Sequence, residues 1–164
     1  MDKDYFVSLL LKNISEESPE IIFKGGTSLS KCFGVINRFS EDIDINIKVE
    51  DKPSNADRKE LKSSIIKAIE KSEMVLKNPN DIRSRRDFNQ YKVEYTTNVP
   101  RNEALKENLI VESYLSLKSF PYERRYVKNY IYNFLYTGMN FIILSPCLPM
   151  SLRHEKGSTS PNLV

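Results

Sequence analysis

The chain has 164 residues, of which 40% are hydrophobic and 29% charged, an ordinary composition for a single globular domain. Its formal net charge of +3 is too small to indicate nucleic-acid binding by itself. Two cysteines, no visible signal sequence and no segment near the roughly 20 apolar residues of a membrane span argue against a disulfide scaffold and a membrane protein, so we expect a cytoplasmic chain.

The first third of the chain predicts a helix, a strand and a glycine turn. Residues 4–14 have the apolar spacing of an amphipathic helix, and 21–23 are a short apolar strand that stops at the glycine pair 25–26. Thr27 or Ser28 can then cap a second helix, because a short hydroxyl side chain accepts a hydrogen bond from a free N–H of the first turn. Its expected buried positions are Leu29, Phe33 and Ile36.

A second strand, 42–47, alternates apolar and polar residues. Period two places its isoleucines on one face and Asp42 and Asp44 on the other, roughly 6–7 Å apart along the strand. The isoleucines are Ile43, Ile45 and Ile47. Each aspartate can therefore lend an oxygen to one shared metal site.

A third helix is expected to begin at a cap formed by Asn55 or Asp57 and to end before the turn at 78–80. Its predicted buried residues are Leu61, Ile65, Ile69 and Leu76. Residues 87–97 then predict a strand with Tyr91, Val93 and Tyr95 on one face. The basic cluster before it, which is a solvated loop or a phosphate contact, contains Arg83, Arg85 and Arg86.

The strand predicted over 108–117 carries Glu112 on one face with Ile110 and Tyr114. A carboxylate is costly to bury on a mostly apolar strand unless it is paired or bound to a metal. Residues 125–136 predict an aromatic-rich helix, and the chain from Met139 on predicts an apolar strand followed by a disordered end.

A glycine pair at a helix N-terminus lets backbone N–H groups approach a phosphate. Two carboxylates on a neighbouring strand can hold magnesium, which takes oxygen ligands and substrate phosphates. At these residues the chain resembles the DNA polymerase beta type nucleotidyltransferase superfamily, and KGGTSLSK followed by RFSEDIDI is similar to the AbiEii/AbiGii toxin family of abortive-infection and toxin–antitoxin systems.

The resemblance implies an α/β (α+β) nucleotidyltransferase core, a mixed twisted sheet with helices mainly on one side. It implies transfer of a nucleoside monophosphate from a triphosphate to an RNA hydroxyl, with tRNA as the expected acceptor and a cognate antitoxin as partner. Two Mg²⁺ ions would be held by Asp42, Asp44 and a third acidic residue on a strand beside theirs. For that residue we favour Glu112, and Glu94 on the preceding strand is the alternative. The residues expected to bind the nucleotide are Lys24, Gly25, Gly26, Thr27, Ser28, Lys31 and Lys92.

Members of that family are usually longer and continue into a mostly helical half. We therefore expect a nucleotidyltransferase core over 1–138, an atypical, partly disordered tail over 139–164 and a missing second half. The alternatives are an inactive remnant and a nucleotide- or RNA-binding module without turnover.

Overall fold

The computed structural model describes residues 2–36, 42–48, 52–82, 85, 87–96, 108–115, 121–128 and 141–146. The helices are α1 (Asp2–Glu17), α2 (Gly25–Ser28), the π-helix η1 (Leu29–Phe33) and α3 (Asn55–Lys71). The strands are β1 (Ile21–Lys24), β2 (Asp42–Ile47), β3 (Val75–Leu76), β4 (Phe88–Glu94), β5 (Asn108–Tyr114), β6 (Tyr122–Val127) and β7 (Phe141–Pro146).

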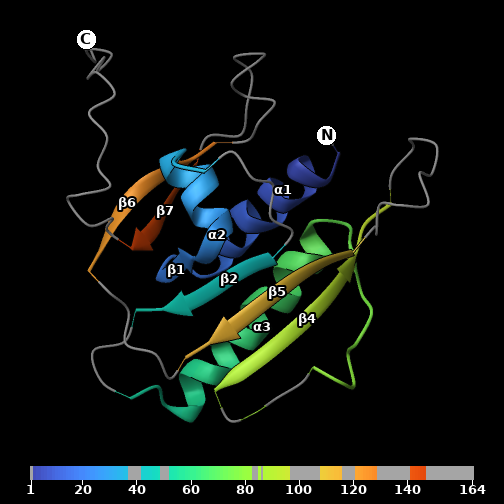
Figure 1. Ribbon diagram of the computed structural model, residues 1–164. Coiled ribbons are helices and arrows are strands. Elements are labelled where there is room, and N and C mark those ends of the chain that lie inside the picture. The colour runs from blue at the N-terminus through green and yellow to red at the C-terminus, as the bar shows by residue number, and fades with distance from the viewer. Residues whose placement is uncertain are drawn as a thin grey trace.

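The strands form one seven-stranded sheet in the order β3-β4-β5-β2-β1-β7-β6. The β2–β5 and β1–β7 pairs are parallel, whereas the other neighbours are antiparallel. Figure 1 shows α1 and α3 together behind β2, β5 and β4, with α2 beside β1 and β2. The predicted α/β architecture, a mixed sheet with helices mainly on one side, is confirmed.

The core lies between the sheet and the two long helices. Alternate residues of β1, β2, β4 and β5 point towards α1 and α3 and are fully buried, as expected for strands with one face on a core. From the strands they are Ile21, Phe23, Ile43, Ile45, Tyr91, Val93, Leu109 and Val111, and from the helices Val7, Leu10, Leu11, Ile14, Ile65 and Ala68. The predicted alternation in β2, β4 and β5 is therefore confirmed. The charged residues Asp42, Asp44, Lys92, Glu94 and Glu112 lie on the opposite face.

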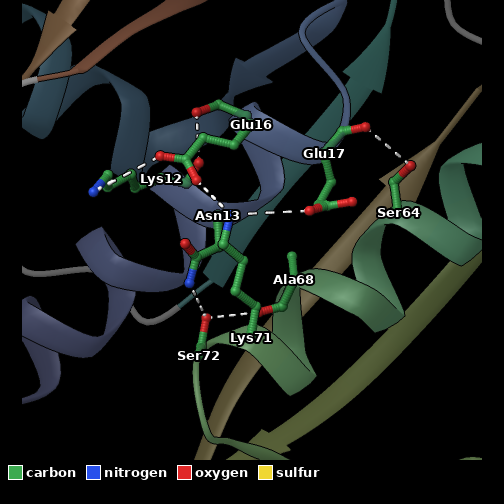
Figure 2. Close-up of polar contacts among 9 residues, drawn as sticks. Lys12, Asn13, Glu16, Glu17, Ser64, Ala68, Lys71 and Ser72 are labelled. Carbon is green, nitrogen blue, oxygen red and sulfur yellow. Dashed lines mark hydrogen bonds and ion pairs between the residues drawn. The ribbon is translucent and has the colours of Figure 1, made fainter.

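A polar seam fixes α1 against α3 (Figure 2). Asn13 donates a 2.8 Å hydrogen bond to Ser72 Oγ, which donates in turn to the carbonyl oxygen of Ala68. Lys71 Nζ lies 2.6 Å from a Glu16 carboxylate oxygen at the exposed rim of the seam. The two long helices thus lie against the core face of β1, β2, β4 and β5. Asp44 and Glu112, which pair in register, lie on the opposite face.

The segment after the glycines differs from the prediction. The helix begins at Gly25, Lys24 is its N-cap without a side-chain hydrogen bond, and the helix passes directly into η1. Neither Thr27 nor Ser28 is the cap, so that expectation was wrong. The buried residues of this segment are Thr27, Ser28, Lys31 and Cys32. The helix ends at Phe33, because Gly34 adopts a left-handed conformation that stops it, so Ile36 lies beyond it.

Two further boundaries differ. Ser54, rather than Asn55 or Asp57, caps α3 in a reciprocal pair with Asp57, and Leu76 belongs to β3 rather than to the helix. Residues 122–127 form β6, so the helix predicted from residue 125 is wrong over 125–127, and its remainder lies outside the described residues. Six register pairs with β7 hold β6, and this tertiary pairing overrides the local helical periodicity.

The apolar strand expected after Met139 is β7, which lies between β1 and β6 in the same sheet as the rest of the chain. The expected disordered end after it falls outside the described residues. Across the described ranges, no helix has the length and apolar character to cross a membrane.

Candidate functional site

A row of half-buried polar side chains crosses four strands on the face opposite α1 and α3. Strand register places Lys24 of β1 opposite Asp44 of β2, and Asp44 opposite Glu112 of β5. Gln90 of β4 completes the row opposite Glu112 and donates a 2.7 Å hydrogen bond from Nε2 to Glu112 Oε1. Neighbouring strands lie about 4.8 Å apart, so this row brings a cation, two carboxylates and an amide together.

Asp42 stands on the same face, two residues before Asp44 on β2, and is exposed. Its register partner on β5 is Ile110, which pairs with Lys92 of β4. The structure therefore brings together all three carboxylates that the sequence singled out. Glu94 lies on β4, one strand further from β2, and its carboxylate contacts Lys77 Nζ at 2.8 Å. Between the two alternatives, Glu112 and not Glu94 lies beside Asp44.

The electrostatics of the row centre on Asp44. Burial raises the pKa of its carboxyl group, and the negative charges of Glu112 and Asp42 raise it further, while Lys24 opposes them. Burial also lowers the pKa of Lys24, which the charge of Asp44 partly offsets. Asp44 is thus held where its charge is poorly compensated by the protein alone, which is the condition that a bound cation would relieve.

Gly25 explains how Asp44 reaches this position. Gly25 has a φ of +74°, and a Cβ atom built on it would lie 1.9 Å from Asp44 Oδ2. The carboxylate therefore occupies the space that any other residue's side chain would need. A glycine is required here both by the backbone conformation and by this close approach.

The hydroxyl groups after the glycine pair bind other parts of the sheet. Thr27 Oγ1 donates a 2.5 Å hydrogen bond to the carbonyl oxygen of Asp42. Ser28 Oγ lies 3.1 Å from Ser145 Oγ of β7, and both Thr27 and Ser28 are buried. These side chains fix the glycine turn to β2 and β7, which leaves only backbone groups of this segment to contact a phosphate.

The two other lysines assigned to the nucleotide behave differently. Lys31 is 3% exposed, and its Nζ lies 2.5 Å from Asp4 Oδ1 and 2.9 Å from Ser8 Oγ, both on α1. Its ammonium group is therefore directed into the α1 interface and not to the carboxylate row. Lys92 is exposed on the open face, in the register row of Asp42.

The carboxylates suit a hard divalent cation, because carboxylate oxygens are the ligands that Mg²⁺ takes in proteins. Over the described ranges, however, no group of three His, Cys, Asp or Glu side chains is already arranged to hold a metal ion. The register and the electrostatic coupling of Asp44 place the three side chains within reach of one another. Backbone hydrogen bonds between β2 and β5 fix the Cα positions of the three residues. Their carboxylates can turn about the side-chain bonds, so they can converge on one ion without a change in the sheet. These oxygen donors are therefore of the type that a divalent metal ion takes, although the side chains are not yet turned to hold one.

Of the predicted basic cluster, Arg85 is described, and Arg83 and Arg86 lie outside the described residues. Arg85 is exposed and forms a reciprocal pair of backbone hydrogen bonds with Phe88, of 3.1 and 2.8 Å. Sequence reasoning did not single out Gln90, although the same alternation that placed Lys92 and Glu94 on the open face also places Gln90 there.

Comparison with known proteins agrees with this geometry. No curated protein and no solved structure matches the chain. A family model described as "Nucleotidyl transferase AbiEii toxin, Type IV TA system" matches residues 9–147, which includes the glycine turn and all three carboxylates. The chain therefore belongs to the AbiEii family of nucleotidyltransferase toxins of type IV toxin–antitoxin systems.

Proposed function

We propose that this chain transfers a nucleoside monophosphate from a nucleoside triphosphate to a hydroxyl group of RNA, with tRNA as the acceptor. The observation that carries the proposal is the register of Asp44 with Glu112, beside the glycine on which the Asp44 carboxylate rests. This places negative oxygen donors next to a turn whose backbone can approach phosphate, and phosphoryl transfer depends chiefly on such positioning and charge.

Asp42, Asp44 and Glu112 would hold two Mg²⁺ ions. When bound, the ions would neutralise charge on the phosphate oxygens and polarise the attacking hydroxyl group. The chain's own part is to supply these oxygens from two adjacent strands, with the Gln90 amide holding Glu112 in place.

The triphosphate would lie at the glycine turn. The backbone N–H groups at the start of α2, from Gly25 to Ser28, offer donors to a phosphate. Lys24 and Lys92 would add positive charge from β1 and β4. Lys31 is not included, because Asp4 and Ser8 bind its ammonium group.

In the proposed step, the acceptor oxygen forms a bond to the α-phosphorus. The bond from that phosphorus to the oxygen bridging the α- and β-phosphates breaks, and pyrophosphate leaves with the electron pair. The proton of the acceptor hydroxyl passes to the Glu112 carboxylate. The reaction would take place in the cytoplasm, where triphosphates and tRNA are found, and would be restrained by a cognate antitoxin.

The test is incubation with each labelled triphosphate, Mg²⁺ and total tRNA. We expect label in RNA with the natural chain, and a loss of at least about 100-fold in Asp44→Asn and Glu112→Gln. The matched control is Glu94→Gln, which changes a carboxylate that pairs with Lys77 one strand away and should retain transfer. Transfer lost in Glu94→Gln but kept in Glu112→Gln would contradict the assignment. Triphosphate binding without any label in RNA would indicate a binding module instead.

A further inference from the structure

Two aromatic side chains lie beside the carboxylate row on its open face. Phe88 of β4 pairs in register with Tyr114 of β5, one step of two residues beyond the Gln90–Glu112 pair. Their ring centroids are 6.1 Å apart with an interplanar angle of 61°, and Tyr114 is 38% exposed. The contact is edge-on, so the rings do not cover each other by stacking.

The backbone beside this aromatic pair is anchored from both sides. Asp87, next to Phe88, accepts hydrogen bonds of 2.9 and 2.7 Å from Arg58 of α3. The carbonyl oxygen of Asp87 also accepts a 2.8 Å bond from the N–H of Leu115, next to Tyr114. These bonds and the contact between the rings fix the strand positions from which both rings project, so a ligand would meet two rings already side by side.

The exposed Arg85 extends the same surface. It pairs in antiparallel register with Phe88, which places the two side chains on the same face. The row Arg85–Phe88–Tyr114 thus presents a guanidinium group followed by two rings. Single-stranded nucleic acids are bound by this combination, in which bases stack on aromatic rings and cations contact the backbone.

The position of the aromatic row Arg85–Phe88–Tyr114 indicates which substrate, the triphosphate or the RNA acceptor, it contacts. The glycine turn follows β1 at the Asp42 end of the site, as the bond from Thr27 to the Asp42 carbonyl shows. The aromatic row lies at the other end, past Glu112, and on strands β4 and β5 rather than β1. A triphosphate at the glycine turn therefore leaves this row to the acceptor. Tyr114 and Glu112 are about 7 Å apart along β5, a separation that one nucleotide can bridge between its base and its sugar hydroxyl.

We propose that Tyr114 and Phe88 form a stacking platform for the terminal base of an unpaired RNA acceptor end, with Arg85 contacting the adjoining phosphate. The platform positions the acceptor hydroxyl at Glu112. This inference rests on the proposed function, and it assigns to that site a preference for single-stranded RNA ends over duplex ends.

The probe is a short single-stranded RNA whose last base is 2-aminopurine, a fluorescent base that dims when it stacks. The chain contains no tryptophan, so the probe's signal is not overlapped by indole emission. We expect dimming with the natural chain and with Tyr114→Phe. Tyr114→Leu should lose the dimming and weaken affinity by about 5- to 160-fold, the range of one base–aromatic stack. The matched control is Tyr126→Leu, which removes a 58% exposed tyrosine on β6 at the far edge of the sheet and should change nothing.

Kinetics separate positioning from a structural role. Tyr114→Leu should raise KM for RNA while leaving KM for the triphosphate unchanged, and should keep the thermal shift produced by Mg²⁺ with triphosphate. Unchanged dimming and affinity in Tyr114→Leu would overturn the platform, as would no binding of the probe. Dimming of a 2-aminopurine riboside triphosphate that is lost in Tyr114→Leu would assign the platform to the triphosphate and also overturn it. Dimming by RNA without any magnesium–triphosphate shift would leave the platform standing and refute nucleotide transfer instead.

Discussion

Asp44 has an environment that disfavours its own charge. Its carboxylate rests on Gly25 and is flanked by Glu112 and Asp42, with Lys24 as the opposing cation in the same row. The protein thereby holds like charges together, as is common at functional sites.

The first prediction concerns the charge of Asp44. Its pKa is raised in the folded protein, so folding favours the neutral form, and ionised Asp44 lowers the free energy of unfolding. The penalty is absent below the ordinary pKa of 3.8 and is complete once the pH exceeds the raised folded value. Without divalent metal at pH 7, Asp44→Asn should therefore be more stable to urea than the natural chain, and this gain should vanish below about pH 3.8.

Magnesium with triphosphate should make the natural chain more stable than Asp44→Asn, because a ligand that binds only the folded state stabilises it. The natural chain should then gain in Tm, and Asp44→Asn should not. The control is Asp81→Asn, which changes an exposed carboxylate outside the site and should alter neither result. A metal-free Asp44→Asn variant that is less stable at pH 7 would show that the carboxylate is structural.

The second prediction uses two glycines that share a conformation but not a neighbour. Gly25 and Gly34 have φ of +74° and +63°, but only at Gly25 would a Cβ strike Asp44, whereas at Gly34 it would meet nothing within 4 Å. Gly34→Ala should cost about 1 kcal/mol in unfolding free energy and retain the magnesium–triphosphate shift. Gly25→Ala should cost more by urea denaturation and abolish that shift. Equal costs with both shifts retained would mean that the Asp44–Gly25 contact does not matter for binding.

At the scale of elements, the site depends on a short helical segment whose buried face is polar. Period-two alternation predicted the faces of β2, β4 and β5 correctly, because each strand has one side on the apolar core. The same kind of reasoning misplaced the cap and the buried face after Gly25. Apolar spacing could not reveal that Thr27, Ser28 and Lys31 are buried through hydrogen bonds to distant partners. Apolar spacing also could not distinguish β6 from a helix, because β6 forms by pairing with β7, a strand further along the chain.

The third prediction tests how α1 holds η1 in place. The Lys31–Asp4 pair has both side chains at most 5% exposed, and burial lowers the pKa of Lys31 although Asp4 raises it. Removing one partner leaves a buried uncompensated charge, so Asp4→Leu should lower the unfolding free energy by about 3–5 kcal/mol. The double variant Asp4→Leu/Lys31→Met should recover most of this loss in urea denaturation.

The exposed pair Lys77–Glu94 supplies the comparison, since its side chains are 50% and 41% exposed. Glu94→Gln should cost less than about 1 kcal/mol. The losses in unfolding free energy of Asp4→Leu and Lys31→Met, each measured alone, should exceed the loss of the double variant. If the two losses summed to that of the double variant, the two charges would not be coupled and the α1–η1 contact would need another explanation.

At the scale of the whole molecule, the sheet brings together segments that are far apart in the chain. β7 lies between β1 and β6, and β5 lies between β2 and β4. Sequence patterns predicted β1, β2, β4, β5 and β7 and the acidic positions, but no local pattern fixes which strands are neighbours. Because β5 is the strand next to β2, Glu112 rather than Glu94 lies beside Asp44. Because β5 also pairs with β4, Phe88 and Tyr114 lie together next to the Gln90–Glu112 pair.

The fourth prediction follows from the distribution of charge over the molecule. The chain has 25 lysines and arginines against 22 aspartates and glutamates, so no large excess of positive charge can hold RNA. Affinity must then come from a few phosphate contacts together with stacking. Each phosphate contact on a single strand contributes about −0.7 to the slope of log K against log salt concentration. Arg85→Ala should make the measured slope shallower by about 0.7, the value for one contact.

Tyr114→Leu should instead weaken binding at every salt concentration and leave the slope unchanged, because stacking releases no counterions. Arg124→Ala is the matched control, since Arg124 is exposed on β6, and β6 is separated from β4 by β5, β2, β1 and β7 in the sheet. Its slope should equal that of the natural chain in fluorescence titrations with the 2-aminopurine probe. A slope that changes with Arg124 and not with Arg85 would direct the RNA across the β6 edge, away from the aromatic row. The acceptor would then approach Glu112 from the β1 side, where the triphosphate phosphates are proposed to lie, so both substrate positions would have to be reassigned together.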